Sequence, residues 1–439
     1  MYETLTHPVD GDPEFAALHR ANPERYPFLL QSTASAGSLG RFEILFAFPG
    51  EVIESCGERR FLTDLDTAFE AGRRTSPDST LPFSGGWFLY LGYELAGDIE
   101  PALALEPDPL LPRAFAVRCP AALVRDLDDG SVTLVAETGA SVDPRLVQAD
   151  IAALEHQSSH SAGVDLLAIH EEPPERFLEA VEAAKLRIAA GDIYQANLSR
   201  EWQLSALDRI DCVSLFRALA RANPAPFAGM IHWRGIEVVS SSPERLVSVR
   251  DGVVSTRPIA GTRPRSDDLA QDRALLEELI AHPKERAEHV MLIDLERNDL
   301  GRVCVPGSVG VDEMMVIETY AHVHHIVSNV RGQLREGVTP GDIIAAVFPG
   351  GTITGCPKVR CMEIISELEG GSRGAYTGSF GYLNRDGSMD INILIRSIVV
   401  NGTEASFRAG AGIVADSEPM AELEETRAKA KGLLKALGL

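Results

Sequence analysis

The segment RFLEAVEAAKLRIAAGDIYQANLSREWQL, residues 176–204, contains the two periodicities on which the fold assignment depends. Its first half repeats apolar residues at spacings of four, three and four, at Phe177, Val181, Ala184 and Ile188. This spacing is typical of one face of a helix, and Gly191 stands where a glycine commonly follows a helix end. Residues 193–204 then alternate well enough between apolar and polar to predict a strand.

The rest of the C-terminal half continues the mixture of helices and strands. The patterns predict a helical region at 267–294 broken at Pro283, glycine-rich turns at 348–357, a helix at 358–368, strands at 376–383 and 389–400, and a last helix at 418–437. Strands grouped between helices without a regular β-α-β alternation favour an α+β fold over a doubly wound sheet.

Composition shifts only once along the chain, between about residues 139 and 174. The stretches GASVDP and HQSSHSAG flank a short helical pattern there, which is typical of a surface connection. We therefore expect three parts: an N-terminal region at 1–140, a connecting segment at 141–174 and a larger region at 175–439. No internal repeat interrupts this order.

The charge of the chain excludes two classes of partner. There are 41 Lys and Arg against 64 Asp and Glu, so the formal charge is −23. Nucleic acids and anionic membrane surfaces are bound by clustered basic residues, so neither is expected. Apolar runs are too short for a membrane span, no signal peptide is visible, and six scattered cysteines indicate free thiols in a cytoplasmic protein.

Two predicted helices carry glutamates three residues apart. Glu285 and Glu288 form one pair, and Glu422 and Glu425 form the other, with Lys429 one turn further on. Helix glutamates are more often simply solvated. Four carboxylates on two helices can also hold a hard cation such as Mg²⁺, which prefers oxygen ligands.

Three further segments allow more than one interpretation. RPIAGTRPR (257–265) is either an anion-binding turn, because guanidinium groups match carboxylates, or a basic surface loop. FPGGTITGCPK (348–358) lacks the Ser or Thr of a phosphate loop after its lysine, so nucleotide binding is rejected. The cluster His322, His324 and His325 is more consistent with one catalytic or packing histidine than with a metal site.

Taken together, eight ordered segments resemble the chorismate-utilising enzymes over residues 175–435. They are GDIYQANLSR (191–200), SSPERL (241–246), RPIAGTRPR (257–265), HPKERAEHVMLIDLERNDLGRV (282–303), HVHHIVS (322–328), FPGGTITGCPKVRCMEIISELE (348–369), GSFGYLNRDGSMDINILIRS (378–397) and AGAGIVADSEPMAELEETRAKA (409–430). The resemblance implies a single α/β sandwich of two large, mainly antiparallel sheets flanked by helices, with the active site between them. Residues 1–140 would be its N-terminal companion region.

The resemblance also implies roles for individual residues. Glu288 and Glu425 match Mg²⁺ ligands, and Glu285 and Glu422 match residues that hold the water shell of the ion, which grips the ring carboxylate of chorismate. The substrate-binding positions match Thr262, Tyr376, Arg396, Gly410, Gly412 and Lys429. Glu244 matches the general acid that protonates the departing 4-hydroxyl, and His325 matches a histidine that faces the ring.

Gln195 separates the branches of this family. Isochorismate and salicylate synthases resemble this chain but use a lysine at that position to activate water. A glutamine has no titratable amine and cannot act as that base. The resemblance therefore implies ammonia as the nucleophile, as in the aminodeoxychorismate synthase and anthranilate synthase branches.

The motifs around YQANLSR, FPGGTITG and TGSFGYL favour the aminodeoxychorismate synthase branch, which makes 4-amino-4-deoxychorismate for 4-aminobenzoate and folate. The anthranilate branch usually has an acidic residue in an L-L-E-S segment, where this chain has Gln31. Against this stands Ala260, which matches the anthranilate branch, because the other branch commonly has a nucleophilic lysine there. Anthranilate, a tryptophan precursor, is thus the alternative product.

Ammonia has to be generated by a further enzyme. No G-x-C-x-G nucleophile turn of a glutamine amidotransferase occurs in the chain, so the resemblance implies a separate glutaminase subunit as partner. A chorismate-binding protein without activity is the alternative outside the enzymes, and the filled acid and metal positions argue against it.

Overall fold

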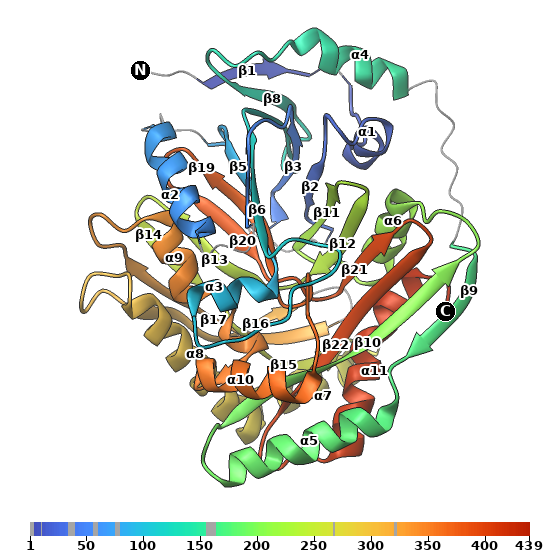
Figure 1. Cartoon of the computed structure of the whole chain (residues 1–439), viewed down its shortest axis with the longest axis vertical. Coiled ribbons are helices and arrows are strands. Elements are labelled where there is room, and N and C mark those ends of the chain that lie inside the picture. The colour runs from blue at the N-terminus through green and yellow to red at the C-terminus, as the bar shows by residue number, and fades with distance from the viewer. Residues whose placement is uncertain are drawn as a thin grey trace.

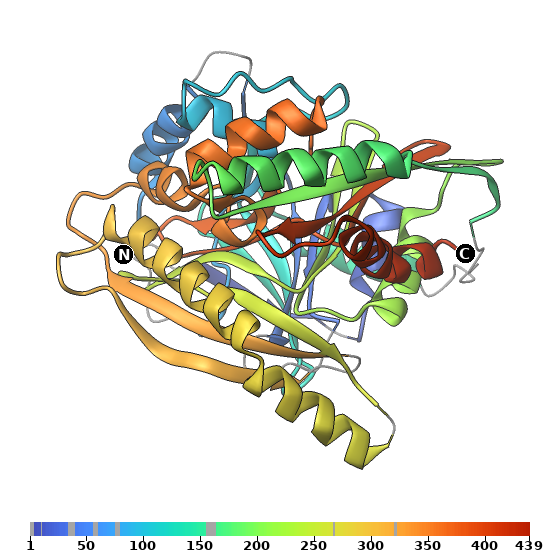
Figure 2. The same ribbon diagram turned by 90° about the horizontal axis from the view of Figure 1, so that it is seen from below.

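The computed structural model describes residues 4–9, 11–33, 40–55, 60–74, 80–154, 164–266, 268–319 and 323–439. Two large sheets run through these residues, and every strand pairing in them is antiparallel. Helices lie against the outside of both sheets (Figures 1 and 2). The fold is α+β, which confirms the predicted sandwich of two antiparallel sheets.

The first sheet combines strands from the whole length of the chain. In spatial order it contains β1 (Thr4–Pro8), β8 (Val132–Glu137), β7 (Ala121–Asp126), β3 (Phe42–Ala47), β2 (Phe28–Gln31), β11 (Phe227–Trp233), β12 (Ile236–Ser242), β21 (Ser397–Asn401), β22 (Glu404–Ile413), β10 (Gln195–Ala206) and β18 (Gly355–Cys356), and β9 (Leu166–Glu171) also pairs with β10.

The second sheet is built in the same way. Its order is β15 (Ile259–Pro264), β17 (Val323–Gln333), β14 (Val253–Thr256), β13 (Arg245–Arg250), β20 (Met389–Asn392), β19 (Ser379–Asn384), β5 (Gly86–Leu91), β6 (Ala114–Cys119) and β4 (Val52–Glu54), and β16 (Gly310–Thr319) also pairs with β17. Residues before 140 therefore add strands to both sheets.

The helices divide between the two outer faces and the ends of the sandwich. They are α1 (Phe15–Ala21), α2 (Phe61–Gly72), α3 (Ala96–Ile99), α4 (Pro144–Leu154), α5 (Pro174–Ala189), α6 (Cys212–Ala222), α7 (Leu269–Ala281), α8 (Pro283–Gly301), α9 (Pro340–Val347), α10 (Lys358–Glu369) and α11 (Pro419–Ala436), with short 3₁₀ turns η2 (Tyr93–Leu95) and η3 (Gly351–Ile353). Helices α7 and α8 follow one another along the side of β15 and β17 (Figure 2).

Aromatic side chains join the inner faces of the two sheets. Phe28 of the first sheet stacks on Phe88 of the second with ring centroids 3.9 Å apart, and Trp233 stacks on Phe115 at 3.8 Å. All four rings are buried. Large aromatic groups dominate such cores because each removes much apolar area from water, so this cluster ties the N-terminal strands to the C-terminal ones.

Most elements lie where the sequence predicts them. Helix α5 and strand β10 match the opening segment, and Gly191 has a φ of +80° directly after the helix. The break at Pro283 separates α7 from α8, although α8 continues to Gly301 rather than ending near 294. The single strand predicted at 389–400 is wrong. Its two halves are β20 and β21, and they belong to different sheets.

Two other predictions concern the chain as a whole. No helix among the described residues has the length and apolar content that a membrane crossing requires. Cys119, Cys212, Cys304, Cys356 and Cys361 are free thiols. The polar stretch HQSSHSAG of the connecting segment lies outside the described residues.

Candidate active site

The candidate site is centred on Arg396, where the chain crosses from one sheet to the other. Residues 393–396 connect β20 to β21, and Arg396 has a φ of +55°, a left-handed conformation that turns the chain. Among the described residues, no side chain forms a hydrogen bond or ion pair with its guanidinium. Burial lowers the pKa of Arg396, and the nearby Tyr376, Glu425 and Glu244 oppose that change. A partly buried guanidinium of this kind favours an anionic ligand.

Glu244 is buried at 5% exposure between β12 and β13. The Thr352 hydroxyl donates a hydrogen bond to Glu244 Oε1 at 2.6 Å. Burial raises the pKa of Glu244 to about 7, while Thr352, the Ile259 backbone, Arg396 and Lys429 act in the opposite direction. A carboxyl that is partly protonated at neutral pH is suited to donate a proton in a reaction.

His325 lies on β17, directly opposite Thr262 in the neighbouring strand β15. Burial lowers the pKa of His325 to about 4, against a hydrogen bond with the Gly261 backbone, so the imidazole is neutral at pH 7. Its neighbour His324 points to the other face of the strand, where it contacts Asp272 at 3.0 Å and the Thr319 hydroxyl at 2.9 Å. His324 therefore supports α7, and of these two histidines His325 faces the candidate site. His322 lies outside the described residues.

Two strands of the first sheet form a further wall of the site. Asn197 on β10 lies opposite Gly412 on β22. A Cβ at Gly412 would come within 2.4 Å of Gln195 Nε2. A side chain at Gly410 would come within 2.6 Å of the Tyr376 hydroxyl and 2.8 Å of Asn197 Oδ1. Within the described part of the chain, nothing donates a hydrogen bond to the buried atoms Gln195 Oε1 and Asn197 Oδ1. Buried acceptors of this kind normally have a partner, so they are available to donors on a ligand.

Tyr376 is contacted by Arg373, a residue that the sequence analysis did not select as part of the site. The Arg373 guanidinium lies 5.6 Å from the centroid of the Tyr376 ring, and it donates to Glu369 Oε1 at 2.6 Å and to the Asn197 carbonyl at 2.7 Å. Burial raises the pKa of Tyr376, so its hydroxyl stays protonated. The only sequence signal for this pair was the spacing of four between Glu369 and Arg373.

The four glutamates approach the site from two helices. On α8, Glu285 Oε1 accepts a hydrogen bond from Arg263 at 3.2 Å, and a Cβ at Gly261 would lie 2.9 Å from Glu285 Oε2. On α11, Glu425 pairs with Lys429 at 2.6 Å.

The described residues contain no group of three potential ligands close enough to hold a metal ion. The donors, all carboxylates, nevertheless match the oxygen preference of Mg²⁺. By donor chemistry the residues fit the ion.

The arginines at 257–265 do not form the anion-binding turn that was one interpretation of the sequence. Arg257 pairs with Glu313 and Glu318, Arg263 with Glu278 and Glu285, and Arg265 with Asp272. Residues 259–264 form strand β15 rather than a loop. Ala260 is paired with Ile326 in that strand, and the side chain of Thr262 lies outside the described residues.

The candidate site combines a cation, Arg396, with a carboxyl of raised pKa, Glu244. Among the described residues it also has two amide oxygens without a donor, those of Gln195 and Asn197. This set of groups is suited to a small molecule that carries carboxylates. The chain belongs to the family of chorismate binding enzymes, whose sequence profile matches residues 24–435. A Bacillus subtilis protein named aminodeoxychorismate synthase component 1 is 41% identical, over 81% of this chain and 78% of its own. A Thermus thermophilus protein named anthranilate synthase component 1 is also 41% identical, over 97% and 95%.

A solved structure has the same fold. Anthranilate synthase component I from Streptococcus pneumoniae superposes with a TM-score of 0.79 at 31% identity, covering 90% of this chain and 92% of its own. The relatives named aminodeoxychorismate synthase and anthranilate synthase are thus equally identical to this chain. The comparisons therefore do not distinguish which product this chain makes.

Proposed function

We propose that this protein aminates chorismate with ammonia, in a magnesium-dependent reaction, to form 4-amino-4-deoxychorismate. The observation that carries the proposal is the state of two candidate site residues, Gln195 and Glu244. The first offers an amide oxygen without a partner among the described residues, and the second has a pKa raised to about 7. An amide acceptor can orient the N–H groups of ammonia, and a partly protonated carboxyl can release a hydroxyl as water.

In the proposed site each group has one task. Arg396 and Lys429 bind the carboxylates of chorismate, and the neutral His325 faces the ring. Tyr376 donates from its protonated hydroxyl near the enolpyruvyl group, and Gly410 and Gly412 leave room for the ligand. Glu288 and Glu425 would hold Mg²⁺, and Glu285 and Glu422 would bind its water shell. When bound, the ion would supply positive charge that offsets the ring carboxylate of the substrate.

The bond changes balance without a redox partner. The nitrogen lone pair of ammonia forms the new C–N bond, and the C4–O bond breaks with its electron pair on oxygen. Glu244 donates the proton with which that oxygen leaves as water. The new ammonium group loses a proton to solvent. Ala260 carries no amine, so no covalent adduct forms at this position.

Anthranilate is the second candidate product, and Ala260 is the observation that favours it. The test is to incubate the chain with chorismate, Mg²⁺ and an ammonium salt at rising free ammonia. We expect a product that a separate 4-amino-4-deoxychorismate lyase converts into 4-aminobenzoate. Fluorescent anthranilate, formed without added lyase, would replace our assignment by the alternative.

A separate glutaminase subunit is proposed as the physiological source of ammonia. If so, glutamine alone supports no turnover by this chain, whereas an ammonium salt does. Turnover with glutamine and the purified chain would contradict a separate partner. The cytoplasm is the compartment that we propose for this reaction.

A further inference from the structure

A buried carboxyl outside the proposed catalytic set lies further along α8. Glu296 is 6% exposed, and Asp299, three residues later on the same side of the helix, is 3% exposed. Lys358 of α10 donates to Asp299 Oδ2 at 2.6 Å. In the described structure, Glu296 has no cation paired with it. Burial is the largest effect on Glu296 and raises its pKa, and the nearby Asp299 and Glu244 act in the same direction, whereas Lys358 and the Thr256 hydroxyl oppose them. The net effect raises the pKa, so this carboxyl holds its proton more tightly than an exposed one.

Glu296 and Glu244 lie on either side of the short turn η3. Thr352 of this turn donates its hydroxyl to Glu244, and a Cβ on the preceding Gly351 would lie 3.3 Å from Glu296 Oε1. Because Gly351 has no side chain, the carboxyl of Glu296 can approach the turn closely. The charge of Glu244 is close enough to affect the protonation of Glu296.

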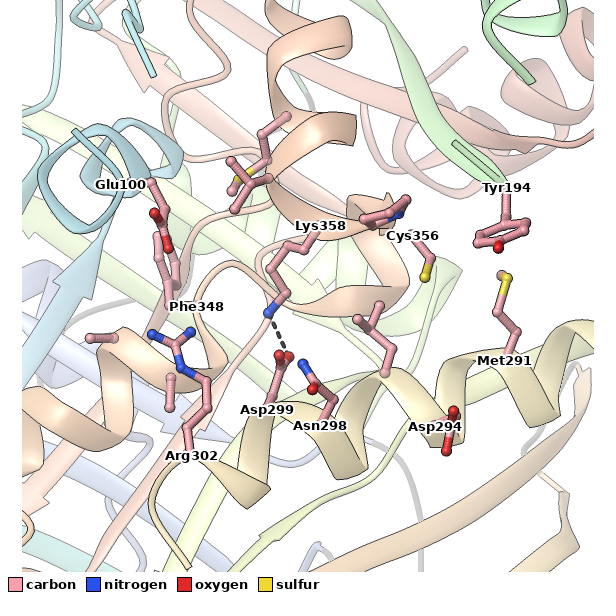
Figure 3. A pocket seen from close by; sticks show the side chains of 16 residues that line it. Glu100, Tyr194, Met291, Asp294, Asn298, Asp299, Arg302, Phe348, Cys356 and Lys358 are labelled. Carbon is pink, nitrogen blue, oxygen red and sulfur yellow. Dashed lines mark hydrogen bonds and ion pairs between the residues drawn. The ribbon is translucent and has the colours of Figure 1, made fainter. Parts of the chain in front are cut away.

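Asp299 and Lys358, the neighbours of Glu296, line a cavity of about 610 Å³ between α8, α9 and α10. Figure 3 shows Lys358 reaching across this cavity to Asp299. Asp294 and Asn298 on the same helix are exposed, so solvent enters there. Glu296, Asp299 and Lys358 thus connect the solvent in the cavity with the turn that carries Thr352.

We propose that Glu296 supplies the proton that restores Glu244 after each turnover, and that Asp299, Lys358 and the cavity connect Glu296 with solvent. The inference rests on the proposed function, because Glu244 must lose a proton to the departing hydroxyl. Glu296 then transfers its proton across η3 to Glu244. It regains one from solvent through the cavity, where the proton released by the new ammonium group also ends. Protons therefore balance over the cycle.

The test compares Glu296→Gln with the wild type in chorismate, Mg²⁺ and an ammonium salt. The amide keeps the size of the side chain but cannot supply the proton. We expect kcat to fall roughly 10- to 100-fold, the KM values for chorismate and ammonium to stay unchanged, and the solvent deuterium isotope effect on kcat to rise. Glu94→Gln is the matched control, because Glu94 is another buried carboxyl with a pKa raised to about 7. Its isotope effect should equal that of the wild type.

Glu296→Ala distinguishes proton supply from a structural role. Added formate should restore turnover in this variant, since a small acid can occupy the space left by the side chain. Asp299→Asn is the second variant and should raise the isotope effect in the same direction. A wild-type isotope effect in folded Glu296→Gln, or no response of folded Glu296→Ala to formate, would overturn the inference alone. An inactive wild type would overturn the proposed function and the inference with it.

Discussion

At the scale of single residues, the protonation of Glu244 is determined by opposing effects. Burial disfavours its charged form, whereas Arg396, Lys429 and the Thr352 hydroxyl favour it. The outcome, a pKa of about 7, is an intermediate value that neither effect alone would produce. In the proposed reaction this residue has to be protonated before the hydroxyl leaves. Activity should therefore fall as the pH rises and the carboxyl loses its proton.

We expect kcat/KM to be constant below pH 7 and to fall as the pH rises through about 7, because the protonated form is the acid. The measurement keeps the concentration of free ammonia equal at every pH. Glu244→Gln should lower kcat about 10²- to 10⁴-fold and remove this limb of the profile. A Glu244→Gln variant with the wild-type profile would show that another group titrates.

The glutamates of α11 provide a second prediction at this scale. Glu425→Gln removes a carboxylate from the proposed metal site, and we expect activity to be lost while the melting temperature stays within a few degrees. Glu424→Gln is the matched control, because Glu424 is the preceding residue on the helix and pairs on the surface with Arg427.

Full activity of Glu425→Gln would refute the metal assignment. Isothermal titration calorimetry of Mg²⁺ binding to both variants measures the affinity for the ion without depending on turnover. Weaker binding in Glu425→Gln alone is the expected result.

At the scale of elements, the decisive feature is the crossover between β20 and β21. The sequence pattern at 389–400 is continuous, so it predicts one strand. In the structure the left-handed turn at Arg396 sends β21 into the other sheet. Arg396, the cation of the candidate site, lies at this bend, close enough to Tyr376, Glu244 and Glu425 of α11 for each to affect its pKa.

Close backbone contact next to this crossover depends on Gly381. In β19 it pairs with Ile391 of β20, and a Cβ at this position would lie 2.7 Å from Ile391 Cα. We expect Gly381→Ala to cost about 1–3 kcal/mol and to lower the melting temperature. Gly301→Ala, at the end of α8 with nothing within 4 Å, is the control and should not destabilise the protein. Equal melting temperatures for the two variants would contradict the observed packing of β19 on β20.

At the scale of the whole molecule, the described residues before 140 and those after 175 share both sheets. Strand β2 pairs with β11, and β5 pairs with β19, so neither sheet is complete without residues before 140. The aromatic stack between Phe28 and Phe88 is made entirely of N-terminal residues from opposite sheets. The division of the chain into residues 1–140, 141–174 and 175–439 stays a prediction.

This sharing predicts that a fragment of residues 175–439 does not fold. Removing β2 and β5 exposes the edges of β11 and β19 and uncovers the buried face of Phe380, all of which are unfavourable in water. Circular dichroism and a thermal scan of the fragment check this outcome. A cooperative unfolding transition in the isolated fragment would show that the two regions are independent domains.

The residues of the candidate site stay predictions, and they could be named from the sequence because their motifs are local. Gln195, Glu244 and the glutamate pairs of α8 and α11 each belong to a short segment on which the resemblance rests. Glu296, Thr352 and Arg373 could not be found in this way, because their partners are distant in sequence: Arg373 contacts the carbonyl of Asn197, and Thr352 contacts Glu244. Chain length does not separate the branches of the family either, since the chain spans 95% of a relative named anthranilate synthase component 1.

The sequence by itself determined the periodicity of the helices and strands, the acidic balance of −23 and the chemical types of the site residues. These properties depend on near neighbours along the chain. Only the tertiary structure decided which charges meet. It neutralised the arginines at 257–265 with glutamates and an aspartate, left Arg396 without an ion pair among the described residues, and raised the pKa of Glu244 by burial. Burial and charge proximity arise from packing between distant segments, and no local pattern contains them.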